Sequence, residues 1–136
     1  MIAVLGDIHF RDDHPYFMKV VERFLEWYFS WELNSPENDL ILAGDLVENS
    51  ILSGQVVNYL ERFIKGSRFK SVNICVGNHD KKKYRNQDQL AFEFFKNKEN
   101  VFVYEDPAEV IIGGIKVLML TGDNAYTARA VAKDAG

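Results

Sequence analysis

Three short aliphatic runs in this chain end in the same way. Residues 3–5, 41–43 and 74–76 are each followed by a glycine and then by an oxygen-bearing side chain, Asp7, Asp45 or Asn78. An aliphatic run that stops at glycine is typical of a strand buried on both faces of a parallel sheet. Open α/β sheets bind ligands at the carboxyl ends of their strands, so we expect the three polar side chains to converge on one rim.

Longer amphipathic stretches separate these runs. Apolar side chains recur at helical spacing over residues 16–33 and 56–64, and we expect a third helix at 88–98. Short strands are expected at 101–104, 110–112 and 115–120, with a closing hairpin around 101–120, and an Ala-rich helix at 125–133. This order predicts an α/β fold in which helices flank a parallel-rich sheet.

The composition narrows the class of protein. The 136 residues are 47% apolar and fit one domain. A net charge of −4 excludes a globally basic nucleic-acid binder but not a local basic patch. The single cysteine, Cys75, excludes a disulfide framework and a cysteine zinc cage, so we expect an inert thiol and a reducing, cytoplasmic location. No segment resembles a signal peptide or a membrane span, and no membrane association is expected.

Oxygen donors gathered on one rim indicate a cation site. Asp7 and His9 are separated by one residue, so on a locally extended backbone their side chains point the same way and can share a metal. In the run Asn78-His79-Asp80, Asn78 can bind a metal while His79 faces a substrate. We expect Asp80 to accept a hydrogen bond from the His79 imidazole and to fix its tautomer. Mixed nitrogen and oxygen ligands favour Mn, Fe, Zn or Ni over Ca or Mg.

Together, these motifs resemble those of the calcineurin-like metallophosphoesterases. That family is recognised by Asp-x-His, Gly-Asp-x-x-Asp/Glu and Gly-Asn-His-Asp/Glu, which correspond here to residues 7–9, 44–48 and 77–80. The resemblance implies the N-terminal half of an αββα sandwich. It also implies that Asp7 and His9 bind the first of two divalent metals, that Asp45 bridges both and that Asn78 binds the second. Manganese is the first choice of metal, with Fe, Zn or Ni as alternatives.

The reaction implied by this resemblance is phosphoester hydrolysis by two-metal, in-line attack of water. His79 would be the acid or phosphate-stabilising group, Asp80 would orient it, and Glu48 would support a metal ligand from outside the coordination sphere. Within the family the chain is most similar to the SbcD-type nucleases and their phage counterparts. The grounds are the helix directly after Asp-x-His, residues 50–63, and residues 100–105 before a hairpin. This similarity implies a phosphodiester substrate such as DNA and an SbcC-type ATPase partner.

A basic run follows the third motif. Lys81, Lys82, Lys83 and Arg85 either contact the phosphate backbone of a nucleic acid next to the metals or form a solvated loop. The remaining histidine, His14, precedes Pro15 at an expected helix start and is predicted to be a surface residue.

Histidine usage leaves two functions open. The family supplies further histidines after its third motif to complete both metal sites, whereas this sequence has none beyond His79. The second metal would then keep only Asp45 and Asn78. The chain is therefore predicted to be either a truncated metal-dependent phosphoesterase or a non-catalytic fragment or partner-binding module that retains a partial metal site.

The end of the chain has a different resemblance. Residues 114–136 are similar to the hinge segment of P-type ATPase phosphorylation domains, where a strand ends in Thr-Gly-Asp-Asn and a helix follows. The Asp-Lys-Thr-Gly-Thr motif of those ATPases is absent, so ATPase activity is not predicted. We expect a family-like half at 1–113 and a strand-helix tail of separate origin at 114–136, packed in the same domain. Asp123 could reach the same rim as Asp7 and Asp45. The alternative to a separate origin of the tail is chance convergence of a strand-turn-helix.

Overall fold

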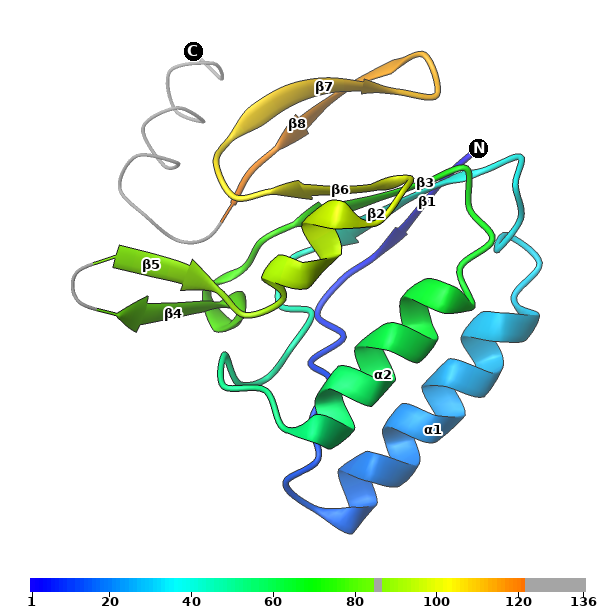
Figure 1. Cartoon of the computed structure of the whole chain (residues 1–136). Helices are drawn as coiled ribbons and strands as arrows, with labels where there is room; N and C mark the ends of the chain where they lie inside the picture. Colours follow the sequence, from blue (N-terminus) through cyan, green and yellow to red (C-terminus); the bar gives the residue numbers. More distant parts are fainter. Residues whose placement is uncertain (85–86, 122–136) are drawn as a thin grey trace.

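A four-stranded parallel sheet forms the centre of the molecule. The computed structural model describes residues 1–84 and 87–121. The sheet has the order β1 (Ile2–Leu5), β2 (Asp39–Ala43), β3 (Ser71–Cys75) and β6 (Val101–Tyr104). All three strand pairs are parallel, so every strand ends at the same edge (Figure 1). The predicted α/β class with a parallel-rich sheet is confirmed.

Two helices cover one face of this sheet. Both α1 (Pro15–Ser30) and α2 (Gly54–Lys65) lie on the same side of the strands (Figure 1). Tyr28 of α1 stacks on Phe63 of α2 with ring centroids 4.3 Å apart, and both are buried. Burial of each such side chain contributes roughly 1.5–3 kcal/mol. Within the described ranges, no helix combines the length and the apolar character needed to cross a membrane.

Polar side chains set the ends of these helices. His14 is exposed and caps α1, its Nδ1 accepting from the backbone N–H of Tyr16 at 3.0 Å, so its predicted surface position is confirmed. Helix α1 ends at Ser30, earlier than expected, because the buried Asn34 side chain bonds backbone groups there. The Asn34 amide donates to the carbonyls of Tyr28 and Gly66 and thereby joins the ends of the two helices.

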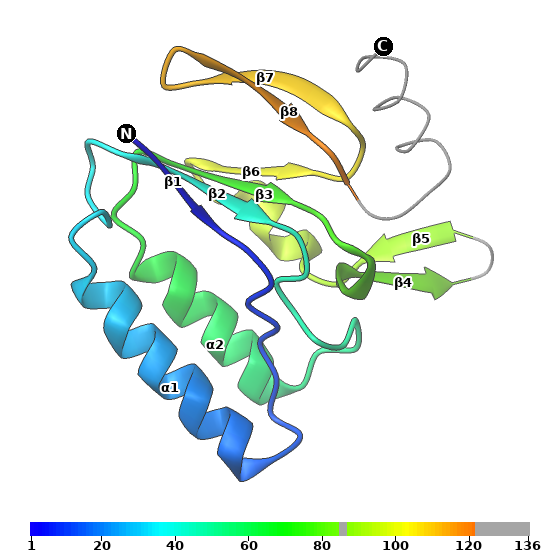
Figure 2. The same cartoon turned by 180° about the vertical axis from the view of Figure 1, so that it is seen from behind.

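A β-hairpin covers the opposite face of the sheet. Strands β7 (Ala108–Ile112) and β8 (Ile115–Met119) pair antiparallel around Gly113 and Gly114, which both have positive φ (Figure 2). A second apolar cluster joins the hairpin to the sheet through Ile41, Cys75, Ile112 and Met119. The expected boundary at residue 113 falls within the hairpin turn. The helix expected at 125–133 and Asp123 lie outside the described residues.

Two sequence predictions are wrong between residues 81 and 104. No helix spans 88–98: β4 (Lys81–Tyr84) pairs with β5 (Gln87–Leu90), and a 3₁₀ helix, η2 (Glu93–Asn97), follows. Pairing with β4 takes residues 87–90 into a hairpin and leaves too few residues for an α-helix. Likewise, residues 101–104 do not belong to the closing hairpin, because β6 pairs with β3 as the fourth parallel strand.

We predict that the reactivity of Cys75 reports whether the β7–β8 hairpin packs on the sheet. Burial raises the pKa of its thiol to about 11, and its Sγ donates to the carbonyl of Leu120 at 2.8 Å. At about pH 8 an unfolded cysteine carries appreciable thiolate, whereas Cys75 in the fold stays protonated. An aromatic disulfide reagent should therefore label the native chain far more slowly than the urea-unfolded chain. Equal rates would mean that the hairpin does not cover this part of the sheet.

Candidate metal centre

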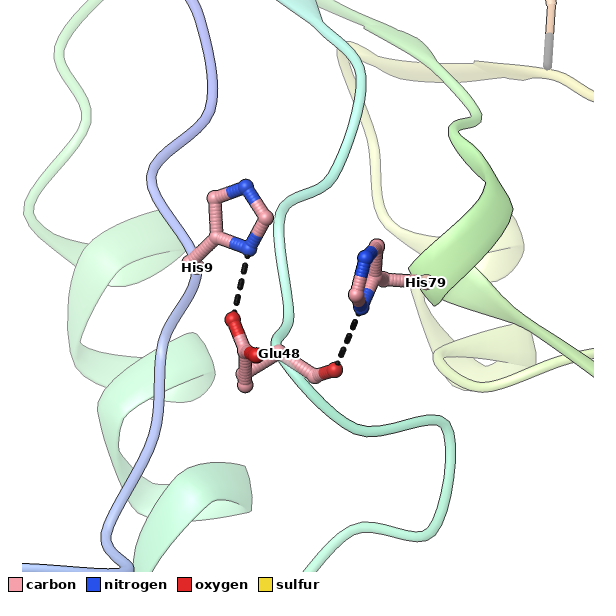
Figure 3. A group of neighbouring side chains, drawn as sticks. All are labelled: His9, Glu48 and His79. Atoms are coloured by element: carbon pink, nitrogen blue, oxygen red, sulfur yellow. Dashed lines mark hydrogen bonds and ion pairs between the residues drawn. The ribbon is translucent and has the colours of Figure 1, made fainter. Parts of the chain in front are cut away.

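Loops at the carboxyl ends of β1 and β2 bring the predicted donors together. One ligand atom from each of Asp7, His9 and Asp45 lies within 4.8 Å of the other two. A second group with the same spacing consists of His9, Glu48 and His79. His9 belongs to both groups, and Figure 3 shows it on the opposite side of Glu48 from His79. The first two sequence motifs therefore meet at one rim, as predicted.

The backbone at this rim has an unusual conformation. Asp7, His9 and Asp45 have φ of 52°, 52° and 48°, in the left-handed region that side chains other than glycine rarely adopt. The extended backbone predicted for Asp7 and His9 is therefore wrong, although both side chains still reach one cluster. Backbone hydrogen bonds hold the loops in place, since the N–H of His9 donates to the carbonyl of Asp45 at 3.0 Å. Strain of this kind persists only where the surrounding structure imposes it and is common at functional sites.

Glu48 fixes the tautomer of His9. Its Oε2 lies 2.8 Å from His9 Nδ1 (Figure 3), and because a carboxylate only accepts, Nδ1 carries the proton. The lone pair then resides on His9 Nε2, which is 3.8 Å from Asp7 Oδ1. A carboxylate behind a histidine ligand orients the ring. The geometry agrees with the supporting role expected of Glu48, which stays a prediction.

His79 is held at the same rim by backbone groups. Its backbone N–H donates to Asp45 Oδ1 at 2.9 Å, and its ring Nδ1–H donates to the backbone carbonyl of Glu48 at 2.8 Å. That carbonyl, together with the nearby carboxylates, raises the pKa of His79 above its ordinary value. The ring lies edge-on to His9, with centroids 5.2 Å apart. His79 therefore presents Nε2 as its remaining polar atom.

Asp80 does not orient the His79 imidazole, and that prediction is wrong. The Asp80 side chain is fully buried, and its two oxygens accept from the backbone N–H groups of Val47 at 3.1 Å and Gly77 at 2.8 Å. Burial raises the pKa of its carboxyl group to about 6. Asp80 thus positions the backbone that carries the candidate ligands, rather than a neighbouring ring.

The structure describes only some of the remaining predicted site residues. Asn78 is exposed and begins the 3₁₀ turn η1 (Asn78–Asp80), next to the His79 N–H that meets Asp45. Lys81 Nζ donates to the carbonyl of Glu105 at 3.2 Å. The side chains of Lys82 and Lys83, and Arg85 as a whole, lie outside the described part of the chain, so the basic run stays a prediction.

One feature beside the centre has no counterpart in the sequence analysis. A cleft of about 130 Å³ adjoins Glu48 and contains Arg11, whose guanidinium bonds Asp13 and lies 3.8 Å from the centroid of the Phe17 ring. Arg11 follows His9 by two residues in the same loop. This short spacing is the sequence feature from which its place beside the centre could have been predicted. The cleft is lined by Phe10, Arg11, Asp12, Asp13, Glu48, Asn49, Ile51 and Val56.

Comparison with known proteins decides the family. The sequence profile of the calcineurin-like phosphoesterases matches residues 1–132. The chain belongs to the calcineurin-like phosphoesterase family. In this calcineurin-like phosphoesterase, the matched region includes the three motifs and continues past the boundary expected at residue 113.

Two solved structures are similar to this calcineurin-like phosphoesterase. A protein of unknown function from Aquifex aeolicus is 18% identical with a TM-score of 0.47, and the match covers 87% of this chain and 58% of that one. The phosphopantetheinyl hydrolase from Mycobacterium tuberculosis is 18% identical with a TM-score of 0.46, covering 99% and 51%. The chain thus spans 58% and 51% of the lengths of these two proteins. A search of curated proteins finds no match.

Replacement of Gly77 by alanine should disrupt the centre. A Cβ at this position would lie 2.3 Å from Asp45 Oδ1 and 2.4 Å from the Asp45 backbone nitrogen, so the backbone must move. We expect Gly77→Ala to lower the free energy of unfolding by about 1–3 kcal/mol or more, as overpacking does. Gly54→Ala is the control, because a Cβ on Gly54 meets nothing within 4 Å. Urea denaturation measures both, and equal stability of the two variants would contradict the close approach.

The buried Asp80 carboxyl group should make stability depend on pH. Its pKa of about 6 in the fold exceeds the ordinary value of 3.8, so the folded chain binds this proton more tightly than the unfolded chain. The stabilisation from the proton is full below pH 3.8 and is lost as the pH rises to about 6.

The test compares the wild type with Asp80→Asn in chelator-treated protein. The free energy of unfolding of the wild type should fall relative to that of the variant by up to about 3 kcal/mol between the two pKa values, at about 1.4 kcal/mol per pKa unit. Urea denaturation at several pH values measures the difference. A difference that does not vary with pH would contradict the raised pKa.

Proposed function

We propose that this chain is a metal-dependent phosphodiesterase that uses two divalent ions and acts on DNA. The observation that supports this function best is the meeting of Asp7, His9 and Asp45 at one rim with His79 beside them.

The residues present fit divalent metals. Glu48 already fixes His9 in the tautomer that a metal ligand needs, and the rim has two carboxylates within reach of that imidazole. Asp7 and His9 would hold the first ion, Asp45 would bridge, and Asn78 would hold the second. Manganese suits this oxygen-rich set. Bound there, the ions would supply Lewis-acid activation of water and neutralise charge on the phosphoryl oxygens.

The chain's own residues would supply the proton for the leaving group and leave the rim open to the substrate. His79 would give a proton from Nε2 to the leaving oxygen, since the Glu48 carbonyl fixes its other nitrogen and raises the pKa of the imidazole above its ordinary value. Asp7 lies open to solvent, with 75% of its side chain exposed. An open rim is accessible to a polymer, which favours DNA over a small enclosed ester. The SbcC-type ATPase remains the proposed partner.

The decisive experiment is hydrolysis of bis(p-nitrophenyl) phosphate and of DNA with manganese. Asp45→Asn should reduce the rate by at least about 100-fold, the upper range for loss of a group that supports a metal. Asparagine tolerates the left-handed φ of residue 45, so the variant should keep its fold. His14→Ser is the control, because His14 is an exposed cap of α1 and serine can also cap. An unchanged rate in Asp45→Asn would refute the site.

A partner-binding module that keeps a partial metal site is the second candidate. The absence of any histidine beyond His79 favours it, because the second ion would have few ligands from this chain. Calorimetric titration with manganese separates the two functions. Two tightly bound ions support the phosphodiesterase, whereas one ion or none, with no hydrolysis, supports the module.

A further inference from the structure

We propose that His9, Glu48 and His79 form a second cation position that takes zinc or a similar transition metal and competes with the first for the same imidazole. Its effect on hydrolysis rests on the proposed function, but binding itself does not. The first position, Asp7 with His9 and Asp45, is the one assigned above to the first of the two catalytic ions. The second position is distinct from the place of the second catalytic ion at Asp45 and Asn78. Occupation of the second position would therefore inhibit the enzyme.

The geometry of the second position is already close to that of a metal site. Its three ligand atoms lie within 4.8 Å of one another and come from loops that follow three different strands. His9 and Glu48 are partly sheltered, with 29% and 34% of their side chains exposed. Figure 3 shows the two imidazoles on either side of Glu48. Two histidines and one carboxylate are the protein ligands of many catalytic zinc and non-haem iron sites.

The two positions exclude each other because they share His9. A neutral imidazole has one nitrogen with a lone pair and one that carries a proton. Glu48 faces His9 Nδ1, so an ion bound between them would take the lone pair of Nδ1 while the proton moves to Nε2, the nitrogen that faces Asp7. His9 can therefore bind one ion at a time. When His9, Glu48 and His79 together bind an ion, the first position keeps Asp7 and Asp45 but has no nitrogen ligand.

The donor types assign a different metal to each position. The first position offers two carboxylates and one imidazole, and the second offers two imidazoles and one carboxylate. Imidazole-rich sites suit zinc, cobalt and nickel, whereas carboxylate-rich sites suit manganese, which also binds most weakly in the divalent series. Manganese should thus fill the first position and zinc the second.

Inhibition follows from what the second position removes. An ion at the second position takes His9 away from the first catalytic ion. It also occupies His79 Nε2, the atom from which the proton would be given, because Nδ1–H stays bonded to the Glu48 carbonyl. One bound ion would therefore remove both a metal ligand and the acid.

The binding test uses zinc alone on the metal-free full chain. Wild type and Asp45→Asn should both bind one equivalent, since Asp45 is not a ligand of the second position and asparagine keeps an oxygen for the His79 N–H. His79→Ala and Glu48→Gln should each weaken zinc binding by tenfold or more. His14→Ser should bind zinc as the wild type does. Calorimetry gives the zinc affinities. In a parallel titration with cobalt in place of zinc, the absorption bands of the bound cobalt report the number of ligands.

The competition test uses the electron paramagnetic resonance signal of free manganese. Zinc added to the manganese-loaded wild type should release manganese, and His79→Ala should need at least tenfold more zinc for the same release. Zinc binding that is lost in Asp45→Asn but kept in His79→Ala would overturn the proposal, as would zinc binding that leaves the manganese at the first position in place. Absence of hydrolysis with these binding results intact would count against the phosphodiesterase alone.

Discussion

A buried carboxylate holds the functional rim together. Asp80 accepts backbone hydrogen bonds from the loop after β2, at Val47, and from the turn after β3, at Gly77. The loop after β1 joins them through the hydrogen bond from His9 to Asp45. Hydrogen bonds from main-chain N–H groups therefore hold the loops of the candidate ligands at their separation. A buried acceptor with several backbone donors is costly to lose, because each N–H would then be unsatisfied.

The sheet and the meeting of the donors could be predicted because their signals are local. Each aliphatic run ends in glycine and a polar residue, and parallel strands bring such ends to one edge. Asp7, His9 and Asp45 meet for this reason. The contact between Glu48 and His9 joins two motifs far apart in sequence, and the expectation for it came from family resemblance rather than from spacing.

The remaining features depend on tertiary contacts that no short pattern contains. Residues 88–98 have the apolar spacing of a helix, but pairing with β4 takes the first of them into a strand. Asp80 follows His79 directly, which suggests contact between the side chains, yet the fold buries one and exposes the other. The left-handed φ of His9 accompanies its hydrogen bond to the neighbouring loop. Histidine is among the residues enriched in this region, but no short pattern says which histidine adopts it.

The strained residues at the rim also connect metal supply to folding. Asp7, His9 and Asp45 adopt their costly conformations in the native chain alone, so an ion that needs this arrangement has little affinity for the unfolded chain. Such a ligand stabilises the native state in proportion to the logarithm of its free concentration. The folded population would then track the metal content of the surroundings, and in scarcity the strand-end loops would be the first part to open.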